Sequence, residues 1–77
     1  MPTITVRLHG GLEGHQGARA QHVIDAAPGA TLLDIQDLLG IPRGEVGLFV
    51  VDGELRSEGE APRAGALVDL YPMFGGG

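Results

Sequence analysis

The segment PGATLLDIQDLLGIP, residues 28–42, contains the clearest helix signal in the chain. Thr31 is a residue type that caps helix N-termini, and Asp34 places a negative charge in the first turn, where it interacts favourably with the helix dipole. Gly40 suits the C-terminal cap, and Pro42 prevents the helix from continuing. The segment therefore predicts one short helix that follows a turn.

The predicted helix, residues 31–39, carries apolar side chains at helical spacing. We expect its core face to consist of Leu32, Ile35, Leu38 and Leu39. Leu32, Ile35 and Leu39 should pack against apolar residues of the first and last strands, namely Ile4, Val6, Val68 and Leu70. The helix then covers one face of a sheet.

Strand patterns lie on both sides of the helix. Residues Thr3 to His9 alternate polar and apolar side chains, which is typical of a half-buried strand. A loop over 10–17 and a returning strand over 18–26 complete a hairpin, whose second strand we expect to turn His22, Ile24 and Ala26 inward. After the helix we expect an apolar strand at 46–51, a tight turn at Asp52-Gly53, a short strand at 54–56, a loop at 57–65 and a final strand at 66–71.

This order of elements predicts an α+β domain: a sheet of four to five strands with one helix packed on one face. The 77 residues form one domain, which is too small to hold a core and also a deep active-site cavity. The chain has no cysteine for disulfides, thiolate metal sites or nucleophilic catalysis, and no lysine that can be modified. A module that works with protein partners fits these limits better than a self-sufficient enzyme.

Charge and hydropathy narrow the function further. The net charge of −5 argues against nucleic-acid binding, which needs clustered cations. No apolar run reaches the length of a membrane span, and the first residues lack the pattern of a signal peptide. We therefore expect a cytoplasmic protein that binds neither nucleic acid nor membrane.

Three features that sometimes mark catalytic sites do not form one here. The glycine-rich loop 10–17 lacks the Gly-Lys-Ser/Thr sequence and the following helix of a phosphate-binding loop. His9, His15 and His22 match no zinc spacing and have no evident acidic or thiol companion, so no metal site is predicted. Ser57 has no candidate base.

The glycines at the C-terminal end, Gly75, Gly76 and Gly77, contribute nothing to a core, because glycine has no side chain to pack and loses the most entropy on ordering. We expect a folded domain over residues 1–74 and a flexible tail over 75–77. Three extended residues reach roughly 10 Å, enough to separate the last carboxylate from the folded body.

Taken as a whole, the chain resembles the MoaD/ThiS family, which comprises the small subunit of molybdopterin synthase and the sulfur carrier of thiamine biosynthesis. The matching stretches are PGATLLD at 28–34, LLGI at 38–41, VVDG at 50–53, LYP at 70–72 and the final Gly76-Gly77. The resemblance implies a β-grasp (ubiquitin-like) fold and a protein co-substrate rather than an enzyme.

The resemblance also implies a chemistry and its partners. An adenylating enzyme of the ubiquitin-activating type (MoeB/ThiF) uses ATP to activate the Gly77 carboxylate. A persulfide or sulfide donor then converts the adenylate into a thiocarboxylate. A synthase subunit of the MoaE or ThiG type accepts the sulfur for molybdopterin, tungsten cofactor or thiamine. The carrier itself binds no cofactor, and Gly75 and Gly76 let the tail enter the narrow active site of another protein.

Two departures leave other functions open. The family usually has Gly-Asp before the last strand, where this chain has Gly65-Ala66, and residues 71–74 (YPMF) are similar to a subgroup of ubiquitin-like domains fused to nucleases. One alternative is an interaction module in which the glycines are inert. Another is a ubiquitin-like modifier that is joined to lysines of other proteins.

We also predict a partner surface beside the tail. If Val68 and Leu70 face the core, then alternation turns Leu67, Asp69 and Tyr71 outward. Either Phe49 or Val50 must also point away from the helix. The predicted partner-binding residues are Phe49, Tyr71, Met73 and Phe74, because aromatic side chains in exposed apolar patches often anchor partners. In the alternative arrangement, Met73 and Phe74 fold back against the sheet edge.

Overall fold

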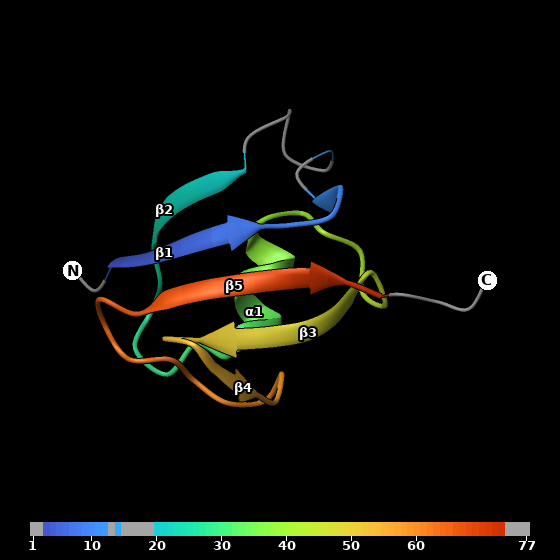
Figure 1. Ribbon diagram of the computed structural model, residues 1–77. Coiled ribbons are helices and arrows are strands. Elements are labelled where there is room, and N and C mark those ends of the chain that lie inside the picture. Colours follow the sequence, from blue (N-terminus) through green and yellow to red (C-terminus); the bar gives the residue numbers. More distant parts are fainter. Residues whose placement is uncertain (1–2, 13, 15–19, 74–77) are drawn as a thin grey trace.

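The computed structural model describes residues 3–12, 14 and 20–73. It contains the strands β1 (Thr3–Leu8), β2 (Gln21–Asp25), β3 (Val46–Val51), β4 (Glu54–Arg56) and β5 (Leu67–Pro72), and the helix α1 (Leu32–Leu38). The strands form one sheet in the order β2-β1-β5-β3-β4 (Figure 1). β1 and β5 are parallel in the middle of the sheet, and every other neighbouring pair is antiparallel.

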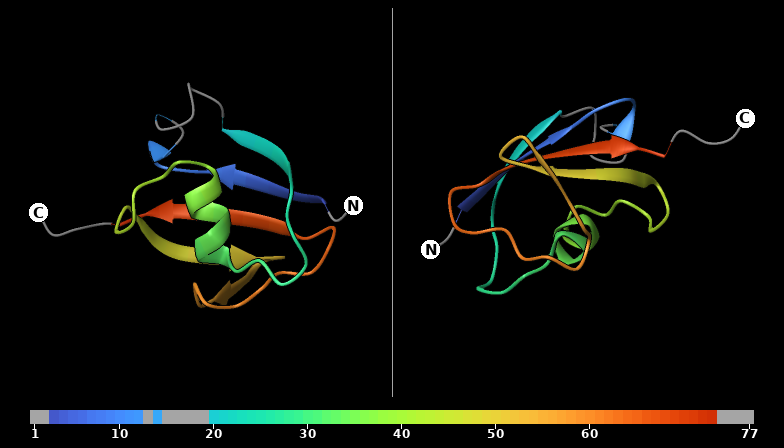
Figure 2. Two further views of the ribbon diagram at one scale, coloured as in Figure 1. Left: turned by 180° about the vertical axis from the view of Figure 1, so that it is seen from behind. Right: turned by 60° about the horizontal axis from the view of Figure 1, so that its bottom comes forward.

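Helix α1 lies across one face of this sheet, and among the described residues no helix covers the other face (Figure 2). The mixed sheet with one helix confirms the predicted α+β, β-grasp fold. Because β1 and β5 run in parallel, the end of β5 lies at the same end of the sheet as the loop that follows β1, and opposite the start of β1 (Figure 1). This topology positions the start of the C-terminal segment.

The local signals around α1 act as predicted. The hydroxyl of Thr31 accepts a hydrogen bond from the backbone N–H of Asp34, and the Asp34 carboxylate accepts one from the backbone N–H of Thr31. This reciprocal capping box satisfies two N–H groups that the first turn leaves without helical partners. Gly40, just beyond the cap residue Leu39, adopts a φ of 74°, which ends the helix in the left-handed conformation that glycine tolerates.

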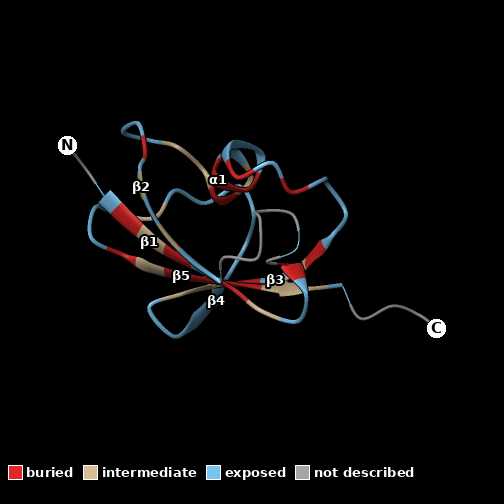
Figure 3. Ribbon diagram, turned by 90° about the horizontal axis from the view of Figure 1, so that it is seen from above, coloured by how far each residue is buried: buried red, intermediate tan, exposed pale blue. Residues whose placement is uncertain are grey.

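The core lies between α1 and the inner face of the sheet, where the buried residues of both meet (Figure 3). Leu32, Ile35 and Leu39 belong to one cluster with the predicted strand residues, Ile4, Val6, Val68 and Leu70, and with six others: Leu8, Leu12, Ala26, Ile41, Val46 and Phe49. The predicted packing of the helix on the first and last strands is therefore confirmed.

One helix residue was placed wrongly. Leu38 is 62% exposed, whereas Gln36 is buried. At 100° per residue, Leu38 lies roughly 100° away from Leu39 around the helix and falls outside the stripe that faces the sheet. Gln36 takes the buried position because its side-chain amide donates to the backbone carbonyls of Ile41 and Pro42, so that its polar atoms keep partners.

The strand registers decide which side chains face away from α1. His22 and Ile24 pair with Val6 and Ile4 and so turn inward, as predicted. Phe49 pairs with the core residue Leu70 and is only 8% exposed. The placement of Phe49 on an exposed patch is therefore wrong.

In place of Phe49, Val50 occupies the outward position, opposite Asp69 of β5. Several strand limits also differ from expectation: β1 ends at Leu8, β2 spans only Gln21–Asp25, and β5 is shifted by one residue to Leu67–Pro72. Within the described part of the chain, no helix is long and apolar enough to cross a membrane.

Candidate functional site at the end of β5

The predicted reactive residue Gly77, the tail residues Gly75 and Gly76, and Phe74 lie outside the described residues. The last described residue, Met73, is 57% exposed. Its backbone N–H donates a hydrogen bond of 2.9 Å to the carbonyl of Glu45, the residue just before β3, so the chain is held up to Met73. We call the region where the chain leaves the sheet after Pro72 the exit.

Tyr71, the predicted aromatic anchor beside the tail, lies on the outer face of the sheet and is partly exposed. Its ring stacks on the imidazole of His9, with a centroid distance of 4.5 Å and an interplanar angle of 9°. His9 follows β1 directly, and its backbone N–H bonds to the carbonyl of Leu70. The parallel pairing of β1 with β5 thus fixes one face of the Tyr71 ring.

Below this stack lies an ionic cluster that the sequence did not reveal. Asp69 points outward as predicted but is only 5% exposed. Its carboxylate accepts hydrogen bonds from Arg7 (Nε to Oδ1, 2.7 Å; Nη2 to Oδ2, 3.2 Å) and lies 2.9 Å from Nε2 of His9. The hydrogen bond from Arg7 is the main reason that the pKa of Asp69 lies below its ordinary value, and burial opposes this shift.

The ionic cluster also corrects the expectation that the histidines lack an acidic companion, because Asp69 is such a companion of His9. His22 lies on the inner face of β2, the opposite side of the sheet from this cluster. His15 is outside the described residues. Because Arg7 of β1 pairs with Asp69 of β5, the cluster stabilises the contact between these two strands beneath Tyr71.

Apolar side chains surround Tyr71 on the side of β3 and β4. Leu48 pairs with Tyr71, and Leu55 pairs with Val50 across the β3–β4 ladder, so all four face outward. Leu48 is 43% and Leu55 66% exposed. We call Leu48, Val50, Leu55 and Tyr71 the outer patch. An exposed apolar patch of this kind is typical of a protein-binding surface.

Met73 and Phe49 line a hollow of about 500 Å³, to which Leu33 of α1 also contributes. Leu48 and Leu55 of the outer patch line the same hollow. The structure therefore places Tyr71 on the outer face of the sheet and Met73 beside Phe49 in this hollow, which adjoins the outer patch through Leu48 and Leu55. The sequence analysis missed Leu48 and Leu55. Once Val50 is known to face outward, alternation along β3 adds Leu48, and pairing across the Asp52-Gly53 turn adds Leu55.

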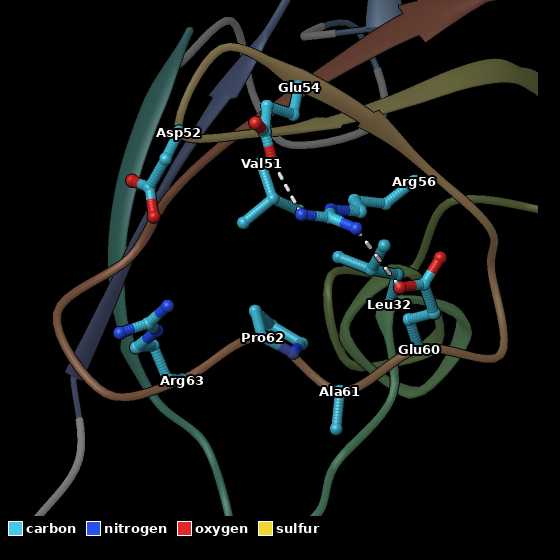
Figure 4. A pocket seen from close by; sticks show the side chains of 9 residues that line it. All are labelled: Leu32, Val51, Asp52, Glu54, Arg56, Glu60, Ala61, Pro62 and Arg63. Atoms are coloured by element: carbon cyan, nitrogen blue, oxygen red, sulfur yellow. Dashed lines mark hydrogen bonds and ion pairs between the residues drawn. The ribbon is translucent and has the colours of Figure 1, made fainter.

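A second hollow, also about 500 Å³, lies near the start of β5 (Figure 4). In Figure 4, Arg56 lies between Glu54 and Glu60 and is ion-paired with both. Asp52 and Arg63 lie at the other side of the hollow, and the backbone N–H of Leu67 donates to the Asp52 carboxylate. The hollow contains none of the predicted site residues, so we place the candidate site at the exit and the outer patch.

Comparison with known proteins gives matches to one family model and to several solved structures. The sequence profile of the family described as Mut7-C ubiquitin matches residues 1–76. No match was found among curated proteins. Similar solved structures include small archaeal modifier protein 1 of Haloferax volcanii, with 24% identity, a TM-score of 0.74, and coverage of 94% of this chain and 98% of that chain.

Two further similar structures are molybdopterin-converting factors. A putative subunit 1 from Pyrococcus furiosus has 16% identity and a TM-score of 0.76, over 94% of this chain and 98% of that one. A complex of subunits 1 and 2 from Helicobacter pylori contains a chain with 20% identity and a TM-score of 0.62, over 97% of this chain and 99% of that one. These likenesses extend along the whole described fold and show that the chain shares the fold of these proteins. Together with the family match, they confirm the predicted ubiquitin-like character of the chain.

Proposed function

We propose that this chain, which belongs to the Mut7-C ubiquitin family, is a ubiquitin-like sulfur carrier. An adenylating partner enzyme activates the C-terminal carboxylate of its Gly77. The observation that supports this most strongly is the course of β5. This strand, central in the sheet, ends at an exit beside the outer patch. Met73 and Phe74 follow the strand in the sequence, and three glycines come after them.

The proposed chemistry begins with activation, because a free carboxylate shares its negative charge over two oxygens and is a poor electrophile. A carboxylate oxygen of Gly77 attacks the α-phosphate of ATP in an adenylating enzyme, and pyrophosphate leaves. A sulfide then attacks the carbonyl carbon and AMP leaves, which produces the thiocarboxylate. If a persulfide attacks instead, a thiol must afterwards cleave the S–S bond. ATP is bound by the partner, and this chain remains a protein co-substrate of cytoplasmic enzymes.

The residues of the chain supply presentation and recognition. β5 carries the tail to the end of the sheet, and the outer patch offers the adenylating enzyme an apolar surface next to it. Glycines without Cβ atoms let the backbone enter a narrow active site. The thiocarboxylate then passes to a sulfur-accepting synthase subunit. A protein of the same fold forms a complex with a second subunit in Helicobacter pylori, which supports this kind of partnership.

Conjugation to protein lysines is a second candidate, because the fold is shared with small archaeal modifier protein 1. It uses the same activation, but an amine rather than sulfur attacks the carbonyl. A third candidate, an interaction module with inert glycines, is favoured by the family match together with the YPMF sequence at residues 71–74. The three differ in what becomes of Gly77.

Intact-mass spectrometry separates these candidates. The chain is incubated with a MoeB/ThiF-type adenylating enzyme, ATP and a sulfide source. We expect a mass shift equal to the exchange of one oxygen for sulfur, located at Gly77 by fragmentation. Deletion of Gly77 should abolish the shift and leave the melting temperature unchanged, since glycine has no side chain that could pack in a core. A sulfur exchange that persists without Gly77 would disprove the assignment.

A further inference from the structure

Pro72, the last residue of β5, is approached closely by a glycine of the loop that follows β1. A Cβ atom built on Gly10 would lie 2.6 Å from Cγ and 2.8 Å from Cδ of Pro72, which is closer than real Cβ contacts. Gly10 also has a φ of 61°, in the left-handed region. Any other residue at this position must push the proline ring away or move the loop.

A second glycine encloses the same residue from the side of β3. A Cβ atom built on Gly47 would lie 2.9 Å from the Cα of Met73 and 2.9 Å from the carbonyl oxygen of Pro72. Gly47 is not among the described glycines with positive φ. The requirement for glycine at this position is therefore steric. Gly47 lies at the shift in register between Val46 and Leu48, where β3 approaches the backbone of the exit.

Further contacts hold the residues on either side of Pro72. The ring of Tyr71 is stacked on His9, and the backbone N–H of Met73 bonds to the carbonyl of Glu45. Segments 9–10, 45–47 and 71–73, far apart in the sequence, thus meet at one place. Residues 71–73 are therefore in contact with two other segments of the chain.

Direction matters because of the length of chain beyond the exit. Four residues follow Met73 up to Gly77, and a fully extended chain of four residues spans up to roughly 14 Å. Tilting such a chain by about 10° at the exit moves its terminal carboxylate by roughly 2 Å. Misplacement of a reacting group by about 1 Å can lower a rate on the order of a hundredfold.

We propose that Gly10 and Gly47 are positioning residues that form a collar around Pro72 and aim the C-terminal segment at the active site of the adenylating partner. This inference rests on the proposed function for its biochemical consequence. The direction of the exit is a physical property that can be measured separately from activation.

Matched alanine variants isolate the collar. Gly10→Ala is compared with Gly11→Ala, because both glycines have positive φ but a Cβ at Gly11 meets no atom within 4 Å. Gly47→Ala is compared with Gly59→Ala, where a Cβ also meets nothing within 4 Å. Pro72→Ala removes the Cγ and Cδ atoms that Gly10→Ala would strike, so it should rescue Gly10→Ala but not Gly47→Ala, which strikes backbone.

The first readout is a distance between nitroxide labels at Ser57→Cys and Gly76→Cys, measured by pulsed electron resonance in a chain otherwise free of cysteine. We expect Gly10→Ala and Gly47→Ala to shift or broaden the distance distribution, and both controls to leave it unchanged. If Gly10→Ala fails to fold, its double variant with Pro72→Ala should fold and return the wild-type distribution. Wild-type distances in folded Gly10→Ala and Gly47→Ala variants would overturn the collar.

The second readout is kcat/KM for ATP–pyrophosphate exchange by the adenylating enzyme, measured without spin labels. We expect a loss on the order of tenfold to a hundredfold in the two collar variants and none in the controls. Normal exchange in collar variants whose distance distribution has shifted would overturn the positioning role. If the wild-type chain is not activated at all, the proposed function fails, while the distance measurement still decides whether the collar directs the exit.

Discussion

Truncation of Leu32 tests the helix–sheet packing, and the chain provides its own control, Leu38, six residues further along the same helix. Leu32 is fully buried, whereas Leu38 in the same helix is 62% exposed. Leu32→Ala removes a buried side chain and leaves a cavity, at a cost of about 2–5 kcal/mol in unfolding free energy. Leu38→Ala removes the same atoms from solvent, and we expect a change within about 0.5 kcal/mol.

The consequence should be large for so small a domain. At about 0.05–0.15 kcal/mol per residue, a chain of this length has a total stability of roughly 4–12 kcal/mol. Leu32→Ala therefore removes a large part of the total and should lower the melting temperature by about 10 °C or more. Urea denaturation followed by circular dichroism measures both variants. Equal losses for Leu32→Ala and Leu38→Ala would refute the assignment of the buried helix face.

Two further predictions concern the outer face of the sheet. Arg7 lowers the pKa of Asp69 in the folded state, so ionised Asp69 stabilises the fold above its unfolded-state pKa, and this contribution is lost as the pH falls below about 4. Asp69→Asn should therefore be less stable at neutral pH and lose less stability on acidification. If urea titrations show the same acid dependence for Asp69→Asn and the wild type, this prediction is wrong. Tyr71→Ala should weaken binding to the adenylating enzyme, measured by calorimetry, by about 1–3 kcal/mol. The control Val23→Ala removes an exposed apolar side chain at the opposite edge of the sheet and should leave the affinity unchanged. Equal affinities of the two variants would show that the outer patch is not part of the interface.

The fold was predictable because local signals and long-range packing agree. The capping residues Thr31 and Asp34 and the glycine at 40 gave the limits of α1 to within a residue. Alternation in the first strand identified Ile4 and Val6 as core residues. Leu38 was misplaced because two adjacent leucines at the end of a short helix fit the apolar period almost equally well, and the structure selects Leu39.

The site was predictable only in part. In the run 46–51 nearly every side chain is apolar, so alternation cannot tell which parity faces the helix, and the pairing of Phe49 with Leu70 decides it. The cluster of Arg7, His9 and Asp69 joins residues about 60 positions apart, and it depends on the parallel pairing of β1 with β5. No pattern within a sequence window contains that information.

The proposed role of Gly77 is tested most directly by mass spectrometry of the C-terminal peptide from protein isolated from its native cells during active cofactor synthesis, with thiocarboxylates trapped by alkylation. The sulfur-carrier account predicts a peptide that ends at Gly77 and carries an alkylated thiocarboxylate in a fraction of the molecules. A Gly77 joined to a target lysine would assign the chain to the modifiers. A peptide in which the carboxylate is always unmodified, or in which the chain continues past Gly77, would contradict the account.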